Sequence, residues 1–190
     1  MTMSIAVARA TLADLARHDG KAELIDGRIV DLMATGHRPG EIAENIHASL
    51  RVHVRATRRG RTHADGVGFA IPPLPGSGRE SFCPDTSYFE GQRPLNPMGF
   101  IQGAPAFAVE VRSENDYGPA AELELAAKRT DYFLASTIVV WDVDPVAEVV
   151  RCYRRGNPLP DVFVRGQIAD AEPAVPGWRI SVEDVFEEMP

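Results

Sequence analysis

The sequence predicts an α/β fold with a mixed central sheet flanked by helices. Ala106–Arg112 is a nearly continuous apolar run, as expected of a strand that is buried on both faces. Two longer segments, Pro39–Arg59 and Pro119–Ala135, instead carry apolar residues at helical spacing. Because strand and helix segments alternate along the chain, we expect the helices to pack on the faces of one sheet.

The two main helices have recognisable ends. Ile42, Ile46 and Leu50 recur at helical spacing in the first, and Gly60 is suited to end it. Pro119 suits the first turn of the second helix, where an N–H group would have no partner within the helix. These two helices are therefore the ones that we expect to cover the sheet.

Shorter elements are predicted from turn and capping signals. Asp26-Gly27 is a strong two-residue turn signal, so residues 22–32 are expected to form a hairpin. Ser181, followed three residues later by Asp184, resembles a capping pair for a short final helix. The other expected elements are a short helix at 11–17, strands at 61–71, 82–90 and 138–143, a strand at 148–154 that completes a second hairpin, and long loops at 72–78 and 91–105.

Size and composition indicate one domain over residues 1–190, with enough chain for a buried core. Hydrophobic residues make up 44% and charged residues 25%, a balance typical of a soluble globular protein. No stretch approaches the roughly 18 apolar residues that span a bilayer, and the first residues lack the pattern of a secretory signal. We therefore expect a cytoplasmic protein without membrane contact, in which Cys83 and Cys152 are reduced and structural.

The net charge of −7 argues against a simple nucleic-acid binder, which usually presents a basic face. The distribution of charge weakens that argument, because five arginines gather at the end of the first main helix: Arg51, Arg55, Arg58, Arg59 and Arg61. They form either the solvated face of a helix or an edge that follows a phosphate backbone. On the second interpretation, Arg55 and Arg59 are candidates for contact with DNA.

Two acidic residues follow apolar segments of predicted strands. Asp85 comes after Pro84 and the segment 81–83, and Glu110 comes directly after the segment 106–109. A carboxylate in such a position is costly if it is buried without a partner. Strands of one small sheet tend to be neighbours, and two carboxylates at one edge can share a hard divalent cation. The pattern favours a Mg²⁺ or Mn²⁺ site that cleaves a phosphodiester. The alternatives are a turn residue at Asp85 and an arginine partner for Glu110.

Three further residues are candidates for this site. Lys128 is suited to steady an attacking water or a phosphoryl oxygen, although Glu124, four residues earlier, offers it an ordinary ion pair along the helix. Arg112 shares a strand face with Glu110 and either clamps a phosphate or pairs with that glutamate. Glu23 opens the first hairpin and is either an additional ligand or a solvated carboxylate.

These residues occur in an order that resembles the Uma-two family, which comprises restriction endonucleases of the PD-(D/E)XK nuclease superfamily. The resemblance covers the chain from about Leu12 to its end. No single motif is specific, but the ordered set is. It consists of Glu23-Leu-Ile-Asp-Gly-Arg-Ile-Val, Pro84-Asp85, Glu110-Val-Arg-Ser113, Lys128-x-x-x-Tyr132 and Trp141-Asp-Val-Asp-Pro145.

The resemblance implies a restriction-endonuclease-like fold and the hydrolysis of DNA. It implies that Asp85, Glu110 and the Val111 carbonyl hold Mg²⁺ or Mn²⁺, with Glu23 as an outer or second-metal ligand. Asp85 and Glu110 are then catalytic together with Lys128. A homodimer is also expected, because nucleases that cut both strands often work as dimers.

The chain departs from the superfamily pattern in one place and from the family pattern in two. The superfamily usually has its lysine two residues after the glutamate, where this chain has Arg112, and Lys128 matches a lysine that has moved to the following helix. Glu114-Asn115 replaces the common Pro-Ser, and the segment 135–137 lacks the usual glycine. These departures leave a second interpretation open, in which the chain is a catalytically inactive interaction module that is homodimeric.

Overall fold

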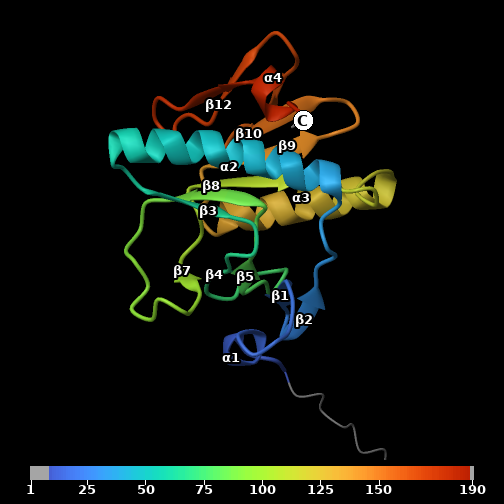
Figure 1. Cartoon of the computed structure of the whole chain (residues 1–190). Coiled ribbons are helices and arrows are strands. Elements are labelled where there is room, and N and C mark those ends of the chain that lie inside the picture. The colour runs from blue at the N-terminus through green and yellow to red at the C-terminus, as the bar shows by residue number, and fades with distance from the viewer. Residues whose placement is uncertain (1–8, 189–190) are drawn as a thin grey trace, which may run out of the picture.

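The computed structural model describes residues 9–188, and its centre is a six-stranded mixed sheet (Figure 1). In spatial order the sheet runs β11–β10–β9–β8–β6–β3. The strands comprise β3 (Arg61–Ala64), β6 (Thr86–Phe89), β8 (Phe107–Val111), β9 (Val139–Asp144), β10 (Val149–Arg154) and β11 (Asp161–Phe163). Only β8 and β9 pair in parallel, and the other pairs in this sheet are antiparallel. The predicted mixed sheet is therefore confirmed.

Strand direction explains why two residues far apart in sequence become neighbours. Strand β6 runs antiparallel to β8, with Thr86 opposite Val109. The start of β6 therefore lies beside the end of β8, which places Asp85 near Glu110. The sequence argument assigned both residues to the ends of strands, whereas Asp85 lies just before one strand and Glu110 lies near the end of the other.

The two main helices cover opposite faces of the sheet. Helix α2 (His37–Thr57) packs on β3, β6 and β8, and α3 (Pro119–Leu134) forms the crossover between the parallel strands β8 and β9 (Figure 1). The buried α2 residues Ile42, Ile46 and Leu50 belong to the larger core cluster, as their spacing predicts. Helix α2 begins two residues earlier and ends two residues earlier than predicted, and its C-cap is Arg58 in the left-handed conformation.

The larger core lies between the sheet and α2, and buried residues from the C-terminal segments also belong to it. Trp141 and Trp178 are both buried there and pack on Phe107, so their predicted core role is confirmed. A second core cluster on the α3 side contains Phe82 stacked on Tyr132, with ring centroids 4.0 Å apart. This stacking fixes Tyr132 beside the end of β8.

Two predicted strands are each divided between two sheets. The segment 61–71 contains β3 and, after a turn at Gly66 (φ +85°), the separate strand β4 (Phe69–Ala70). The segment 82–90 contains the end of β5 (Ser81–Phe82) and all of β6. Strands β4, β5 and β7 (Ile101–Gln102) form a small three-stranded sheet, so the predicted loop 91–105 also contains a strand. Gly66 and Gly68 mark the first division and Pro84-Asp85 marks the second. Glycines inside a strand also indicate a bulge, so these residues did not by themselves predict a change of sheet.

The N-terminal elements form as predicted. Helix α1 (Leu12–Leu15) is capped by Thr11 through a capping box with Asp14, and β1 (Ala22–Ile25) and β2 (Arg28–Asp31) form the hairpin. Within residues 9–188, no helix is long and apolar enough to cross a lipid bilayer.

The segment after β10 contains more structure than the sequence indicated. Besides β11, it forms a hairpin of β12 (Ile168–Asp170) and β13 (Arg179–Ser181), followed by α4 (Val182–Val185). The N–H of Asp184 donates to Ser181 Oγ at 3.1 Å, which confirms the predicted cap. Strands of three residues are too short for their alternation to be recognised.

Candidate active site

The end of β8 directs Glu110 toward α3. Its neighbours Val109 and Val111 belong to the core on the α2 side, so alternation along the strand turns Glu110 to the opposite face. There Lys128 Nζ donates to Glu110 Oε2 at 2.8 Å, and the Tyr132 hydroxyl donates to Oε1 at 2.6 Å. Lys128 and Tyr132 are one helical turn apart, so both reach the same carboxylate. The predicted proximity of Lys128 and Glu110 is therefore present.

Glu23 lies beside this pair but is bound by several other groups. Its Oε2 accepts a hydrogen bond from the Arg79 guanidinium, and its Oε1 accepts one from the Cys83 N–H at 2.9 Å. Lys128 Nζ lies 3.3 Å from the same Oε1. The Glu23 side chain is 3% exposed, so the alternative of a solvated carboxylate is wrong. The Lys128 ammonium therefore bridges Glu23 of the hairpin and Glu110 of the sheet.

Arg79 extends this network to α3. Besides Glu23, its guanidinium binds Asp131, with Nε 2.9 Å from Oδ2, and it lies over the Phe82 ring at 5.2 Å. Both the Arg79 and Asp131 side chains are at most one-tenth exposed. Buried charges of this kind require partners, and the pairing ties the β1–β2 hairpin to α3.

Asp85 is held from two sides. Its Oδ2 accepts a hydrogen bond from the Val111 N–H at 2.8 Å, directly after Glu110. Its Oδ1 lies 3.1 Å from Lys21 Nζ, and the same ammonium lies 2.5 Å from Asp65 Oδ1. Asp85 is therefore fixed to the end of β8 by a backbone bond and to the hairpin by an ion pair.

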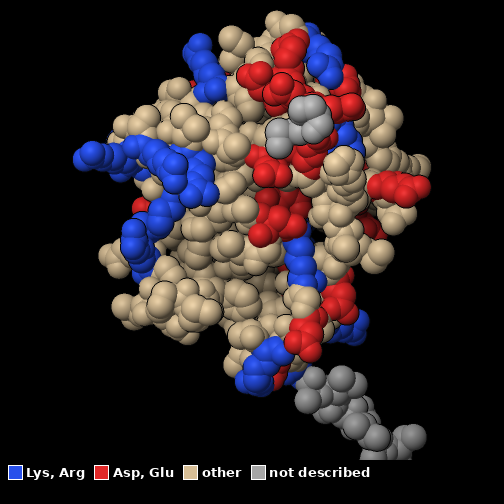
Figure 2. Space-filling view, viewed as in Figure 1, with Lys and Arg blue, Asp and Glu red and all other residues tan. Residues whose placement is uncertain are grey.

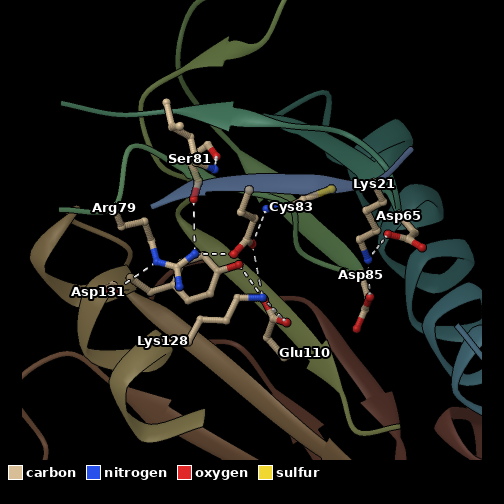
Figure 3. Close-up of polar contacts among 12 residues, drawn as sticks. Lys21, Asp65, Arg79, Ser81, Cys83, Asp85, Glu110, Lys128 and Asp131 are labelled. Atoms are coloured by element: carbon tan, nitrogen blue, oxygen red, sulfur yellow. Dashed lines mark hydrogen bonds and ion pairs between the residues drawn. The ribbon is translucent and has the colours of Figure 1, made fainter. Parts of the chain in front are cut away.

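The carboxylates of Asp85, Glu110 and Glu23 all line one open cleft of about 570 Å³, bounded by the β1–β2 hairpin, the sheet and α3. Figure 3 shows the Lys128 ammonium next to Glu110, and the Lys21 ammonium between Asp65 and Asp85. Among residues 9–188, no group of three or more His, Cys, Asp and Glu side chains is close enough to form a preassembled metal site.

The electrostatics of the cleft favour additional positive charge. Burial raises the pKa of Glu110, and the carboxylates of Asp85 and Glu23 raise it further, against the attraction of Lys128. Burial by itself would lower the pKa of Lys128, but Glu110 and Glu23 outweigh that effect and raise the pKa above its ordinary value. Lys128 is therefore charged at neutral pH. Crowded carboxylate oxygens are the donors that Mg²⁺ and Mn²⁺ prefer, so the residues fit such an ion chemically.

The prediction for Arg112 was wrong. This arginine was expected to contact a phosphate or to pair with Glu110, but its guanidinium binds Asp142, at 2.6 and 2.8 Å, and Glu122. The residue is 4% exposed. Asp142 is the register partner of Glu110 on the neighbouring parallel strand and therefore shares its face of the sheet. The arginine is thus neutralised by two carboxylates and is not available to a phosphate.

Arg55 and Arg59 are exposed, but they lie far from the cleft. Gly40, near the start of α2, shares a cavity with Asp85, and a helical rise of 1.5 Å per residue puts Arg55 about 22 Å further along the axis. Figure 2 shows basic side chains over the C-terminal half of α2 and acidic side chains toward its other end. These arginines therefore form a separate basic surface.

Lys21, Asp65 and Tyr132 lie at the site but were not proposed for it from the sequence. Tyr132 stands four residues after Lys128, and this spacing on a helix was an available signal. Lys21 and Asp65 gave no local signal, because each lies at the edge of a short strand and they meet only through folding.

The fold and the site together define a nuclease-like α/β protein with an acidic, lysine-containing cleft. A family model described as "Uma2: Putative restriction endonuclease" matches residues 9–183, so the chain belongs to this family. The expected fold is also found in a crystal structure titled as a "putative nuclease belonging to DUF820" from Anabaena variabilis. The two chains are 20% identical with a TM-score of 0.72, and the match covers 93% of this chain and 97% of the other. No curated protein matches this chain.

Proposed function

We propose that the chain is a metal-dependent endonuclease that hydrolyses phosphodiester bonds of DNA. The observation that carries the proposal is the convergence of Asp85, Glu110 and Lys128 on one cleft, although they come from three separate segments of the chain. Membership of a family described as restriction endonucleases supports DNA as the substrate.

Asp85, Glu110 and the Val111 carbonyl are the groups that would hold Mg²⁺ or Mn²⁺. A bound divalent ion supplies polarisation of the scissile phosphate and a bound water of lowered pKa. The Val111 N–H fixes one Asp85 oxygen and thereby orients that carboxylate toward the end of β8. The Tyr132 hydroxyl does the same for Glu110 from the side of α3.

Lys128 contributes a positive charge that needs no metal. Its ammonium, held by Glu110 and Glu23, positions an attacking water or stabilises the charge that develops on a phosphoryl oxygen. Glu23 was expected to be an outer or second-metal ligand. Because its oxygens already bind Arg79, Cys83 and Lys128, we assign it to holding Lys128 in place.

The test is Mn²⁺- or Mg²⁺-dependent nicking of plasmid DNA by wild-type protein, Asp85→Asn and Lys128→Met. Asp85→Asn keeps an acceptor for the Val111 N–H and removes the charge, so it should lower the rate at least about 100-fold. Removal of a preorganised electrostatic group costs about 10²–10³ in rate, which is the loss expected for Lys128→Met. Equal cleavage by wild type and Asp85→Asn would exclude this site.

A second candidate function is a non-catalytic interaction module, and one observation favours it. The Asp85 and Glu110 oxygens already have partners within the chain, namely Lys21, the Val111 N–H, Lys128 and Tyr132. Calorimetric titration with Mn²⁺ separates the two functions, because binding at millimolar metal supports the nuclease and its absence supports the module. Sedimentation analysis tests the homodimer that we predict for either function.

A further inference from the structure

Lys21 occupies an unusual position for a cation in this chain. Of the 20 lysines and arginines, only Lys21 and Lys128 are lysines, and both line the cleft. An ammonium is a compact point charge on a flexible stem, whereas a guanidinium is a rigid planar fork. Lysine is therefore suited to a site where a small cation is shared between carboxylates or moves from one to another.

The backbone holds Lys21 at the open end of the hairpin. The N–H of Leu32 donates to the Lys21 carbonyl at 2.9 Å, and β1 begins at the next residue. The side chain is 20% exposed, and its Nζ lies 2.5 Å from Asp65 and 3.1 Å from Asp85. The ammonium thus bridges two carboxylates from different parts of the chain (Figure 3).

Both Asp85 oxygens already have a partner. Oδ2 accepts the hydrogen bond from Val111, and Oδ1 is paired with Lys21. Glu110, whose neighbour Val111 bonds Asp85, is itself paired with Lys128 of α3. A divalent ion bound by Asp85 through either oxygen lies close to the Lys21 ammonium, because that ammonium is 3.1 Å from Oδ1 of the same carboxylate. The two positive charges then repel each other.

We propose that Lys21 is a built-in competitor for the metal site, whose ammonium holds Asp85 in the metal-free protein and is displaced onto Asp65 when a divalent cation binds. The inference rests on the proposed function of this cleft and adds a determinant of its metal affinity. Lys21 acts through Asp85 and is therefore a positioning residue.

Asp65 provides the place to which Lys21 moves. Its contact with the ammonium is the shorter of the two, and its side chain is 42% exposed, against 12% for Asp85. Asp65 Oδ1 also accepts a hydrogen bond from the Gly66 N–H at 2.7 Å, which fixes its orientation in the turn after β3. Lys21 can therefore leave Asp85 without losing its remaining anion partner.

The test is calorimetric titration of the full chain with Mn²⁺ alone. Lys21→Met removes the competing charge and keeps a similar apolar stem, so we expect its dissociation constant to fall about tenfold. Lys21→Arg keeps a competing cation, so it should stay within about threefold of wild type. Arg28→Met is the matched control, because it removes one positive charge from an exposed position of the same hairpin and should change the affinity less than about twofold.

A double variant tests whether Lys21 changes the affinity for Mn²⁺ through Asp85. In an Asp85→Asn background, Lys21→Met should no longer tighten Mn²⁺ binding, because the carboxylate for which the two cations compete is absent. Equal tightening by Lys21→Met and Arg28→Met would overturn the inference and leave the metal site intact. If neither wild type nor Lys21→Met binds Mn²⁺, the proposed metal site fails and the inference fails with it.

A measurement on the wild-type protein covers the case in which Lys21→Met does not fold. Lysine labelled selectively with ¹³C at Cε gives only two side-chain signals in this chain, from Lys21 and Lys128. Titration with diamagnetic Mg²⁺ should shift the Lys21 signal with the midpoint found by calorimetry. A Lys21 signal that stays unchanged while the metal binds would overturn the inference.

Discussion

Replacement of Arg79 by methionine tests whether the polar network beside the cleft is as buried as the structure indicates. The Arg79 side chain is 8% exposed, and its partners Glu23 and Asp131 are 3% and 10% exposed. Methionine keeps an apolar stem over Phe82 but removes the charge. The variant therefore isolates the electrostatic contribution from the packing contribution.

The size of the effect follows from what the partners retain. Removal of one partner from a buried ion pair costs about 3–5 kcal/mol, because the other charge stays buried without compensation. Glu23 keeps the Cys83 N–H and Lys128, whereas Asp131 loses the cation that it binds. We therefore expect the lower end of the range, a decrease of about 3 kcal/mol in the free energy of unfolding.

Urea unfolding followed by circular dichroism measures this change. With a slope of about 2 kcal/mol per molar urea, a loss of about 3 kcal/mol moves the midpoint down by about 1.5 M. Arg9→Met is the control, because the Arg9–Asp26 pair is 66% and 62% exposed and should contribute at most about 1 kcal/mol. A midpoint shift for Arg79→Met no larger than that of Arg9→Met would refute the reasoning.

Two further predictions concern Glu110 and its neighbours. Because burial raises the folded-state pKa of Glu110 above its ordinary 4.5, the stability from this group is present below pH 4.5 and is lost as the pH rises through the raised pKa. The free energy of unfolding of Glu110→Gln relative to wild type should therefore increase between pH 4 and pH 7, and a flat difference would contradict the assigned burial. Tyr132→Phe removes a 2.6 Å hydrogen bond to Glu110 and keeps the stacking on Phe82, so it should cost about 1.5–3 kcal/mol in urea unfolding. An unchanged midpoint would show that the hydroxyl contributes nothing to Glu110.

Much of the fold could be predicted from the sequence, because it depends on local patterns of residues. The spacing of Ile42, Ile46 and Leu50 predicted α2, and the apolar run before Glu110 predicted the buried strand β8. The divisions at Gly66 and Pro84, where the chain leaves one sheet for another, were not predicted. Periodicity reports which side of a strand is buried, but it does not report which sheet the strand joins.

Residues of the candidate site could be predicted where both the residue type and its position in a strand or helix indicated a role in the site. A carboxylate after an apolar strand and a lysine on the next helix indicated Glu110 and Lys128, and the structure brings them within 2.8 Å. The pairing of Arg112 with Asp142 could not be predicted from the sequence, because it depends on the parallel strand pairing that places Asp142 beside Glu110. A same-strand neighbour is only one of several partners available to a long side chain.

The sequence by itself determined the element types, the acidic strand-end residues and the family resemblance, since each depends on residues close together in the chain or on their order. Only the tertiary structure decided that Glu23 is bound by Arg79 and that Lys21 joins Asp85 to Asp65. Those contacts depend on strand direction and on the docking of the hairpin against the sheet. Electrostatic partners are chosen by distance in space, and no local pattern in this chain encodes that distance.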